Sequence, residues 1–265
     1  MLNPKIKSEV EMPFCVVKSS ALKYVLAVIL VAIMLSISIN GATSAQVFFG
    51  YSTRKVPIYA VETDKKQVAI SFDAAWGADK TEDIIETLAE YNATATFFLV
   101  GFWVDKFPEM VQKINSAGLE IGSHSNTHPD LTTLSNEMLK QELVECNKRI
   151  TEITSKPVEV FRCPYGSYNN NVLEAIEAEN MLPIQWDVDS LDWKGISAQE
   201  ITTRIVSKVK NGSIILCHNN ADNIVEALVM VLDRLTGQGY KITSVGELVL
   251  HQDFYVDRNG IQHKN

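Results

Sequence analysis

The segment 68–77, VAISFDAAWG, decides how this chain folds. It begins as an apolar run of the kind that forms a buried strand, and this run ends at Asp73. The pattern therefore predicts a strand with a carboxylate at its C-terminal end. The segment 119–128 repeats the arrangement, because the apolar residues 119–122 lead to His124 and His128. A carboxylate and two imidazoles at strand ends are the groups with which a hydrolase binds a metal and activates water.

Working outward from this segment, short apolar runs alternate with amphipathic helical patterns. Ser135 and Ser197 occupy helix-start positions, Ser197 with the capping-box spacing to Glu200, and Asp79 is expected to cap a further helix. Strands alternating with helices predict an α/β fold with a parallel sheet, closed or nearly closed into a barrel. The strands are expected at 67–72, 94–100, 119–123, 158–162, 182–187, 213–218 and 240–243.

Polar clusters follow these runs. Asp73, His124, Arg162 and His218 stand at or just beyond the ends of expected strands, and so do residues 187–193. Parallel barrels carry their chemistry at the C-terminal ends of the strands. The side chains are therefore expected to meet at one rim.

The N-terminal region differs in kind from the rest. Residues 24–39 carry no charge and follow Lys18 and Lys23. This length lies between the core of a signal peptide and a full membrane span. The expected organisation is a cytoplasmic leader at 1–23, a signal-anchor or signal peptide at 24–45, a linker at 46–66, a catalytic domain at 67–250 and a polar tail at 251–265. The catalytic domain then lies outside the cytoplasm, held by a single-pass anchor or secreted after cleavage near Ala45.

Charge excludes one class of partner. The net charge is −8, and no basic stripe is present to neutralise phosphates. Nucleic acid is therefore not an expected ligand.

Five motifs in a fixed order carry a family resemblance. They are SFDAAWG at 71–77, HSNTH at 124–128, FRCPYG at 161–166, DVDSLDW at 187–193 and ILCH at 215–218. Over roughly 67–250 the chain resembles the NodB-homology polysaccharide deacetylases, family 4 carbohydrate esterases with a distorted (β/α)7 barrel. The form FDAAWG is similar to a membrane-anchored, sporulation-associated subgroup of endospore-forming bacteria.

The resemblance implies a role for each of the first catalytic groups. Asp73 would be the general base that activates water, and Arg162 would pair with it through the fixed fork of the guanidinium. His124 and His128 would bind a divalent metal, zinc or cobalt.

The later motifs imply the rest of the site. The backbone N–H of Tyr165 would stabilise an oxyanion, and His218 would protonate the leaving amine. Asp192 would orient His218, with Asp189 as the competing candidate. In addition, the resemblance assigns the acetyl pocket to Trp193 and Leu216.

The first motif departs from the family pattern at Ala74. Many members carry a second aspartate there, which completes an Asp-His-His metal site, and an alanine methyl binds no metal. Catalytic zinc usually has three protein ligands. This leaves open a weak metal site, a metal-independent hydrolase or an inactive glycan-binding protein.

The expected function is removal of N-acetyl groups from a cell-wall polysaccharide, peptidoglycan or a chitin-like polymer, by a protein of the bacterial membrane. Two alternatives remain open at this point. One is an O-acetyl polysaccharide esterase, which the same site would serve. The other is a glycan-binding protein of the envelope or spore wall without turnover, as Ala74 suggests.

Overall fold

Strand β2 (Gln67–Ala74) is the centre of the main sheet, and all its residues except the first are buried. The structure is a computed structural model that describes residues 19–48 and 54–265. In it, β2 pairs in parallel with β3 (Thr96–Leu99), β8 (Ile214–His218) and β9 (Lys241–Thr243). Burial on both faces explains why this strand is a continuous apolar run rather than an alternating one.

The remaining strands extend this sheet on either side. The order is β6-β5-β4-β3-β2-β8-β7, and β9 joins at β2. All recorded pairings in this sheet are parallel, which confirms the predicted α/β class. The added strands are β4 (Glu120–Ser123), β5 (Val160–Arg162), β6 (Leu182–Ile184) and β7 (Val188–Asp189).

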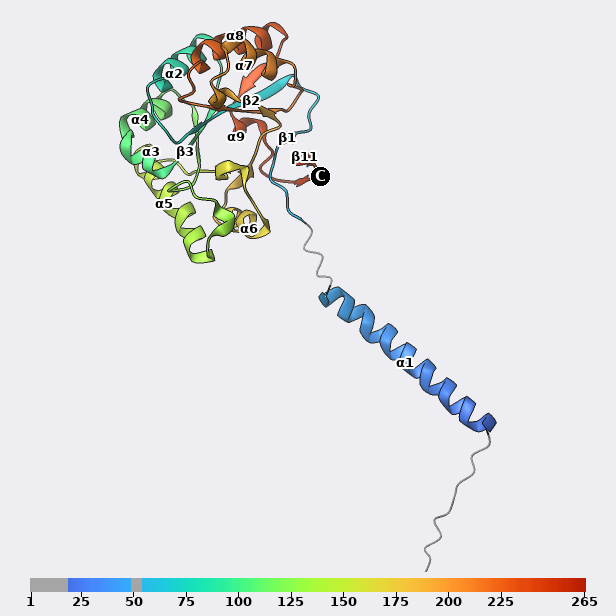
Figure 1. Ribbon diagram of the computed structural model, residues 1–265. Coiled ribbons are helices and arrows are strands. Elements are labelled where there is room, and N and C mark those ends of the chain that lie inside the picture. The colour runs from blue at the N-terminus through green and yellow to red at the C-terminus, as the bar shows by residue number, and fades with distance from the viewer. Residues whose placement is uncertain (1–18, 49–53) are drawn as a thin grey trace, which may run out of the picture. The chain divides into compact units, whose positions relative to one another are not determined.

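Helices lie along the outer side of the curved sheet (Figure 1). Two expected starts are confirmed: Ser135 accepts from Met138 N, and Ser197 forms the capping box with Glu200. The expected cap at Asp79 is wrong, because α2 begins after Lys80 without a side-chain cap. The helices are α2 (Thr81–Glu90), α3 (Gly101–Lys106), α4 (Pro108–Ser116), α5 (Asn136–Thr154), α6 (Asn170–Ala178), α7 (Ala198–Val206), α8 (Ile224–Gly237) and α9 (Val245–Leu248), with short 3-10 turns at Leu131–Thr133, Pro164–Gly166 and Asp192–Lys194.

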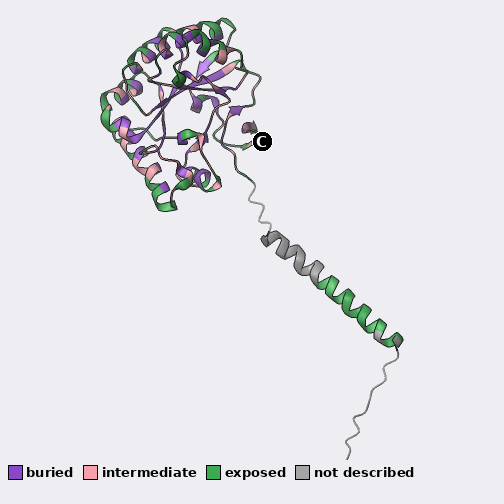
Figure 2. Cartoon of the chain, in the orientation of Figure 1, coloured by how far each residue is buried: buried purple, intermediate pink, exposed green. Residues whose placement is uncertain are grey.

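Two apolar clusters hold these layers together. The larger one joins the sheet to the helices and includes Phe72, Phe97 and Leu143. The smaller one includes Phe98 and Ile58 and brings β3 together with the segment that precedes β1 (Ala60–Val61). Figure 2 shows the strands buried and the helices exposed along one side.

The sheet does not close into the expected (β/α)7 barrel, because it is open at one seam, between β6 and β7. The run expected as one strand at 182–187 ends at Ile184, and the chain then forms β7 at the opposite edge of the sheet. Within the described residues no pairing joins β6 to β7. Ile58 lies at this seam instead, bridging Ile184 and accepting from the Gln185 N–H. The architecture is therefore an open half-barrel of parallel strands.

Both ends of the expected catalytic domain extend further than the motifs indicate. A second sheet joins β1 from the expected linker to β11 (Ile261–Lys264) from the expected tail, and β10 (Phe254–Val256) completes it. Residues 54–265 consequently form one compact unit.

The expected membrane segment coincides with helix α1 (Ser19–Phe48). Over the residues that the structure describes, no helix combines the length and the apolarity needed to cross a membrane. Residues 1–18 of the expected leader lie outside the described residues.

Candidate active site

Asp73 and Arg162 form a buried ion pair at the C-terminal end of the sheet. Asp73 lies near the end of β2, where it pairs with His218 of β8, and Arg162 is the last residue of β5. Arg162 Nη1 lies 2.7 Å from Asp73 Oδ1, and Nη2 donates to the Gln185 carbonyl at 3.1 Å. The guanidinium also lies 4.1 Å from the centre of the Phe98 ring. These contacts fix the fork of Arg162, and the fork fixes the carboxylate.

The environment keeps Asp73 ionised. Burial by itself would raise the pKa of this carboxyl, because it penalises the charged form. The charge of Arg162, with its hydrogen bond and the charge of His218, outweighs burial and holds the pKa below its usual value. A carboxylate in this state accepts a proton at neutral pH.

His124 and His128 lie next to this carboxylate as neutral imidazoles. His124 follows β4, and its Nδ1 donates to the Arg162 carbonyl at 2.7 Å, so Nε2 carries the lone pair. Nε2 lies 3.5 Å from Asp73 Oδ2. Burial lowers the pKa of His124, and burial together with His124 lowers the pKa of His128 to about 4. The two rings are in edge contact at 5.0 Å.

These donors fit a divalent cation, although they supply fewer ligands than a complete zinc site. The lone pair on His124 Nε2 faces a carboxylate rather than a donor, and the buried Nδ1 of His128 has no partner among the described residues. A cation would satisfy such atoms. However, the described residues contain no converging group of three His, Cys, Asp or Glu side chains. Ala74, at the position of the missing carboxylate, packs in the larger apolar cluster.

His218 lies at the end of β8 with its own carboxylate partner. Asp192 Oδ1 accepts from Nδ1 at 2.7 Å, and Oδ2 accepts from the His218 backbone N–H at 2.7 Å. Asp189 instead accepts from the backbone of Leu191. Burial lowers the pKa of His218, but the hydrogen bond and charge of Asp192, with Asp73 and Asp189, outweigh it and raise the pKa. This imidazole is therefore set up to hold a proton.

One cavity of about 760 Å³ brings these groups together. Asp73, His124, His128, Asp192 and His218 line it, and so do the predicted pocket residues Tyr165, Trp193 and Leu216. Arg162 is the exception, because it is fully buried behind Asp73.

Tyr165 has a left-handed backbone at φ 60°, which is uncommon for a residue with a side chain. Its ring packs against His128 at 4.7 Å, and its hydroxyl donates to the His128 carbonyl.

Sequence reasoning missed two kinds of residue here. Trp76 and Trp186 line the cavity without having been assigned to it, and the buried Asn219 holds the loop beside it. The position of Trp76 within the first motif, and of Asn219 just after His218, was the available signal. The exposure of Trp76 and the burial of Asn219 do not follow from the sequence.

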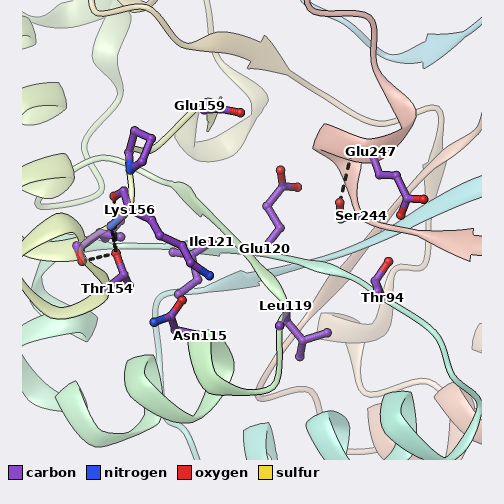
Figure 3. Close-up of a pocket in the computed structure, with 13 residues that line it drawn as sticks. Thr94, Asn115, Leu119, Glu120, Ile121, Thr154, Lys156, Glu159, Ser244 and Glu247 are labelled. Carbon is purple, nitrogen blue, oxygen red and sulfur yellow. Dashed lines mark hydrogen bonds between the residues drawn. The ribbon is translucent and has the colours of Figure 1, made fainter.

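A second recess lies at the opposite end of the strands (Figure 3). Its volume is about 380 Å³, and its lining comes from β4, from the segments just before β3, β4 and β5, and from parts of α5 and α9. Glu120 enters it as a partly buried carboxyl that accepts from Thr96 Oγ1 and from the Gly246 N–H. These bonds brace β4 against β3 and α9, so the carboxyl has a structural role.

A family model for polysaccharide deacetylases matches residues 60–183. A peptidoglycan-N-acetylglucosamine deacetylase of Bacillus cereus is 30% identical over 208 residues, covering 77% of this chain and 95% of the relative. The chain belongs to the polysaccharide deacetylase family.

A second Bacillus cereus protein in this family, also a peptidoglycan-N-acetylglucosamine deacetylase, is 31% identical over 66% of this chain and 64% of its own length. The chain spans less than two thirds of the length of the first curated relatives that it matches.

The solved structures include a family member without activity. A pseudoenzyme of the CE4 family from Bacillus anthracis superposes with a TM-score of 0.72 at 32% identity, covering 79% of this chain and 73% of that one. A mutant of that pseudoenzyme with restored enzymatic activity also matches, with a TM-score of 0.72 at 35% identity over 74% and 72% of the two chains. This polysaccharide deacetylase fold therefore occurs in active and inactive forms.

Proposed function

We propose that the chain is a hydrolase that removes N-acetyl groups from amino sugars of a cell-wall polysaccharide, peptidoglycan or a chitin-like polymer, and releases acetate. The observation that carries the proposal is a pair of oppositely tuned groups in one cavity. The pKa of Asp73 is held low, which favours its ionised form, and that of His218 is held high, which favours its protonated form. Environments that push two pKa values apart define a base and an acid.

The steps follow from these states. Asp73 accepts a proton from water, and the oxygen of that water forms a bond to the acetamide carbon. The backbone N–H of Tyr165 stabilises the resulting oxyanion. His218, oriented by Asp192, then donates its proton to the nitrogen as the carbon–nitrogen bond breaks. Acetate and a free amine are the products.

The remaining residues hold the reacting groups in place. Arg162 keeps the carboxylate of Asp73 oriented through the 2.7 Å contact, and Trp193 and Leu216 surround the acetyl group. His124 and His128 would hold a divalent cation such as zinc or cobalt, whose chemistry is to polarise the carbonyl and acidify water.

Acetate release is the test. The full-length chain would be incubated with peptidoglycan, with N-acetylglucosamine oligomers and with acetylated xylan, each with Zn²⁺ or Co²⁺ and with a chelator. Release from the first two, abolished by Asp73→Asn, is the expected result. Release from xylan alone would assign the site to O-acetyl esters instead.

A second candidate is a glycan-binding envelope protein without turnover. The apolar packing of Ala74 and the similarity to a pseudoenzyme favour it. Binding of the oligomers with no acetate release under any condition would support this candidate and contradict the hydrolase.

We further propose that residues 24–45 direct export and that the family domain acts outside the cytoplasm. The uncharged run 24–39 and the preceding Lys18 and Lys23 support this. Cell fractionation tests it, and N-terminal sequencing distinguishes a retained anchor from cleavage near Ala45. A chain found only in the cytoplasm would contradict it.

The similarity of FDAAWG to the sporulation-associated subgroup extends the proposal to expression during sporulation, which a time course of protein level would check.

A further inference from the structure

Trp76 is a large apolar side chain left exposed at the mouth of the cavity. It follows β2 by two residues, and 63% of its surface is accessible. Asp73 and Leu216, at the proposed reaction, are much deeper, since they are 7% and 4% exposed. The indole is therefore placed to meet parts of a ligand that lie outside the acetyl pocket.

Exposed aromatic rings concentrate at this one place. Within residues 54–265, four aromatic side chains are strongly exposed, and three of them line the cavity: Trp76, Tyr165 and Trp193. The fourth, Tyr255, stacks on His263 in the small sheet. Exposed apolar surface gathered at a cavity marks a binding site, whereas a single exposed ring does not.

The loop that carries Trp76 is fixed in place. The Gly77 carbonyl accepts from Trp103 Nε1 at 2.6 Å and from Asn219 Nδ2 at 3.0 Å. Trp103 and Asn219 are fully buried, so both donors are rigid. Gly77 has φ +65°, a conformation that glycine adopts without strain. The indole is thus held before any ligand arrives, and little conformational entropy is lost on binding.

The indole also has a defined orientation. It packs against Phe102 at 5.2 Å and contacts the edge of His128 at 6.3 Å. His128 in turn contacts Tyr165 at 4.7 Å. Trp76 therefore continues the aromatic lining from Tyr165 through His128 toward α3, away from the acetyl pocket.

We propose that Trp76 binds a sugar ring next to the one that is deacetylated, so that the ligand is a chain of several N-acetylhexosamine units. The C–H face of a pyranose is apolar and packs on an aromatic face, while the ring hydroxyls remain in water. This inference rests on the proposed function, because it places the reacting unit at Asp73.

Calorimetric titration of the full-length chain with N-acetylglucosamine and with its tetramer tests the assignment. Trp76→Ala should weaken tetramer binding about tenfold, equivalent to about 1.4 kcal/mol, and change monomer binding by less than about twofold. Trp76→Phe should retain most of the tetramer affinity. Tyr255→Ala, which removes an exposed ring far from the cavity lining, is the matched control and should change neither.

Three results would overturn the proposal: equal weakening of monomer and tetramer binding in Trp76→Ala, unchanged tetramer affinity in that variant, or no binding of the tetramer by the unaltered chain. The hydrolase is tested separately by acetate release from the same tetramer. Tetramer binding that depends on Trp76 without any acetate release would support the aromatic contact and contradict the catalytic function.

Discussion

Asp73, which is buried, and Glu120, which is partly buried, are carboxyl groups near opposite ends of the same sheet, and their surroundings shift their pKa values in opposite directions. Burial dominates at Glu120 and raises its pKa, although Thr96 and Gly246 oppose the shift with hydrogen bonds. Burial also acts on Asp73, but the charge of Arg162, helped by that of His218, outweighs it and lowers the pKa. Neutral donors satisfy a carboxyl without keeping it ionised, whereas a fixed cation keeps it available as a base. The four predictions below test this contrast.

The largest effect is expected for Asp73, at the C-terminal ends of the strands. Asp73→Asn keeps the size of the side chain but cannot accept a proton, so kcat/KM for acetate release should fall by about 10²–10⁴-fold. Steady-state kinetics on N-acetylglucosamine oligomers would measure it. Unchanged turnover would show that another group activates water.

Ala74→Asp adds the carboxylate that the first motif lacks. With His124 and His128 it would provide three ligands, and zinc affinity should rise at least about tenfold. Zinc titration by calorimetry measures the change, with Ala74→Asn as a control of similar volume and no charge. Equal affinities in the two variants would mean that the carboxylate does not reach the cation.

The pH profile tests the acid of the site. The raised pKa of His218 places the alkaline limb of kcat/KM above about pH 6.5, the ordinary histidine value, because the protonated form is lost only at higher pH. Asp192→Asn removes the charge that raises the pKa and leaves burial, which lowers it. The limb should then move down by about one unit or more. An alkaline limb that does not move in Asp192→Asn would mean that a group other than His218 sets it.

The smallest effect is expected at Glu120. Glu120→Gln should leave kcat/KM within about twofold, since the recess has no part in the proposed reaction. The difference in the free energy of unfolding between Glu120→Gln and the unaltered chain depends on pH. A carboxyl with a raised folded pKa favours folding below its unfolded pKa and loses that contribution as pH rises through the folded value. The variant should therefore gain in melting temperature relative to the unaltered chain between pH 4 and pH 8. A loss of activity would contradict the separation of the two ends.

Sequence patterns predict the groups at strand ends because an apolar run fixes both the strand and where it stops. Asp73, His124 and His218 were placed in this way, and the cavity brings them together. Spacing cannot distinguish Asp189 from Asp192, since three acids lie within one short segment. The structure pairs His218 with Asp192 because a left-handed turn at Leu191 precedes it.

The open seam between β6 and β7 and the small sheet could not be predicted from the sequence, for a different reason. An apolar run such as 182–187 records burial but not which edge of a sheet it joins, so the division into β6 and β7 has no signature. The pairing of β1 with β11 joins segments far apart in the chain, and strands of two and four residues are too short to show a pattern. Such contacts depend on the assembled fold rather than on local pattern.

The pairing of β1 with β11 also affects how the unit is made. His263 contacts Glu62 across a sequence separation of 201 residues, and among the described residues β1 has its parallel neighbour only in β11. β1 leaves the ribosome before the main sheet, and nearly the whole half-barrel must be synthesised before its partner emerges. A contact of such long range forms late, because closing the loop costs entropy before the contact compensates. β1 therefore remains without its strand partner until the last residues of the chain have been synthesised.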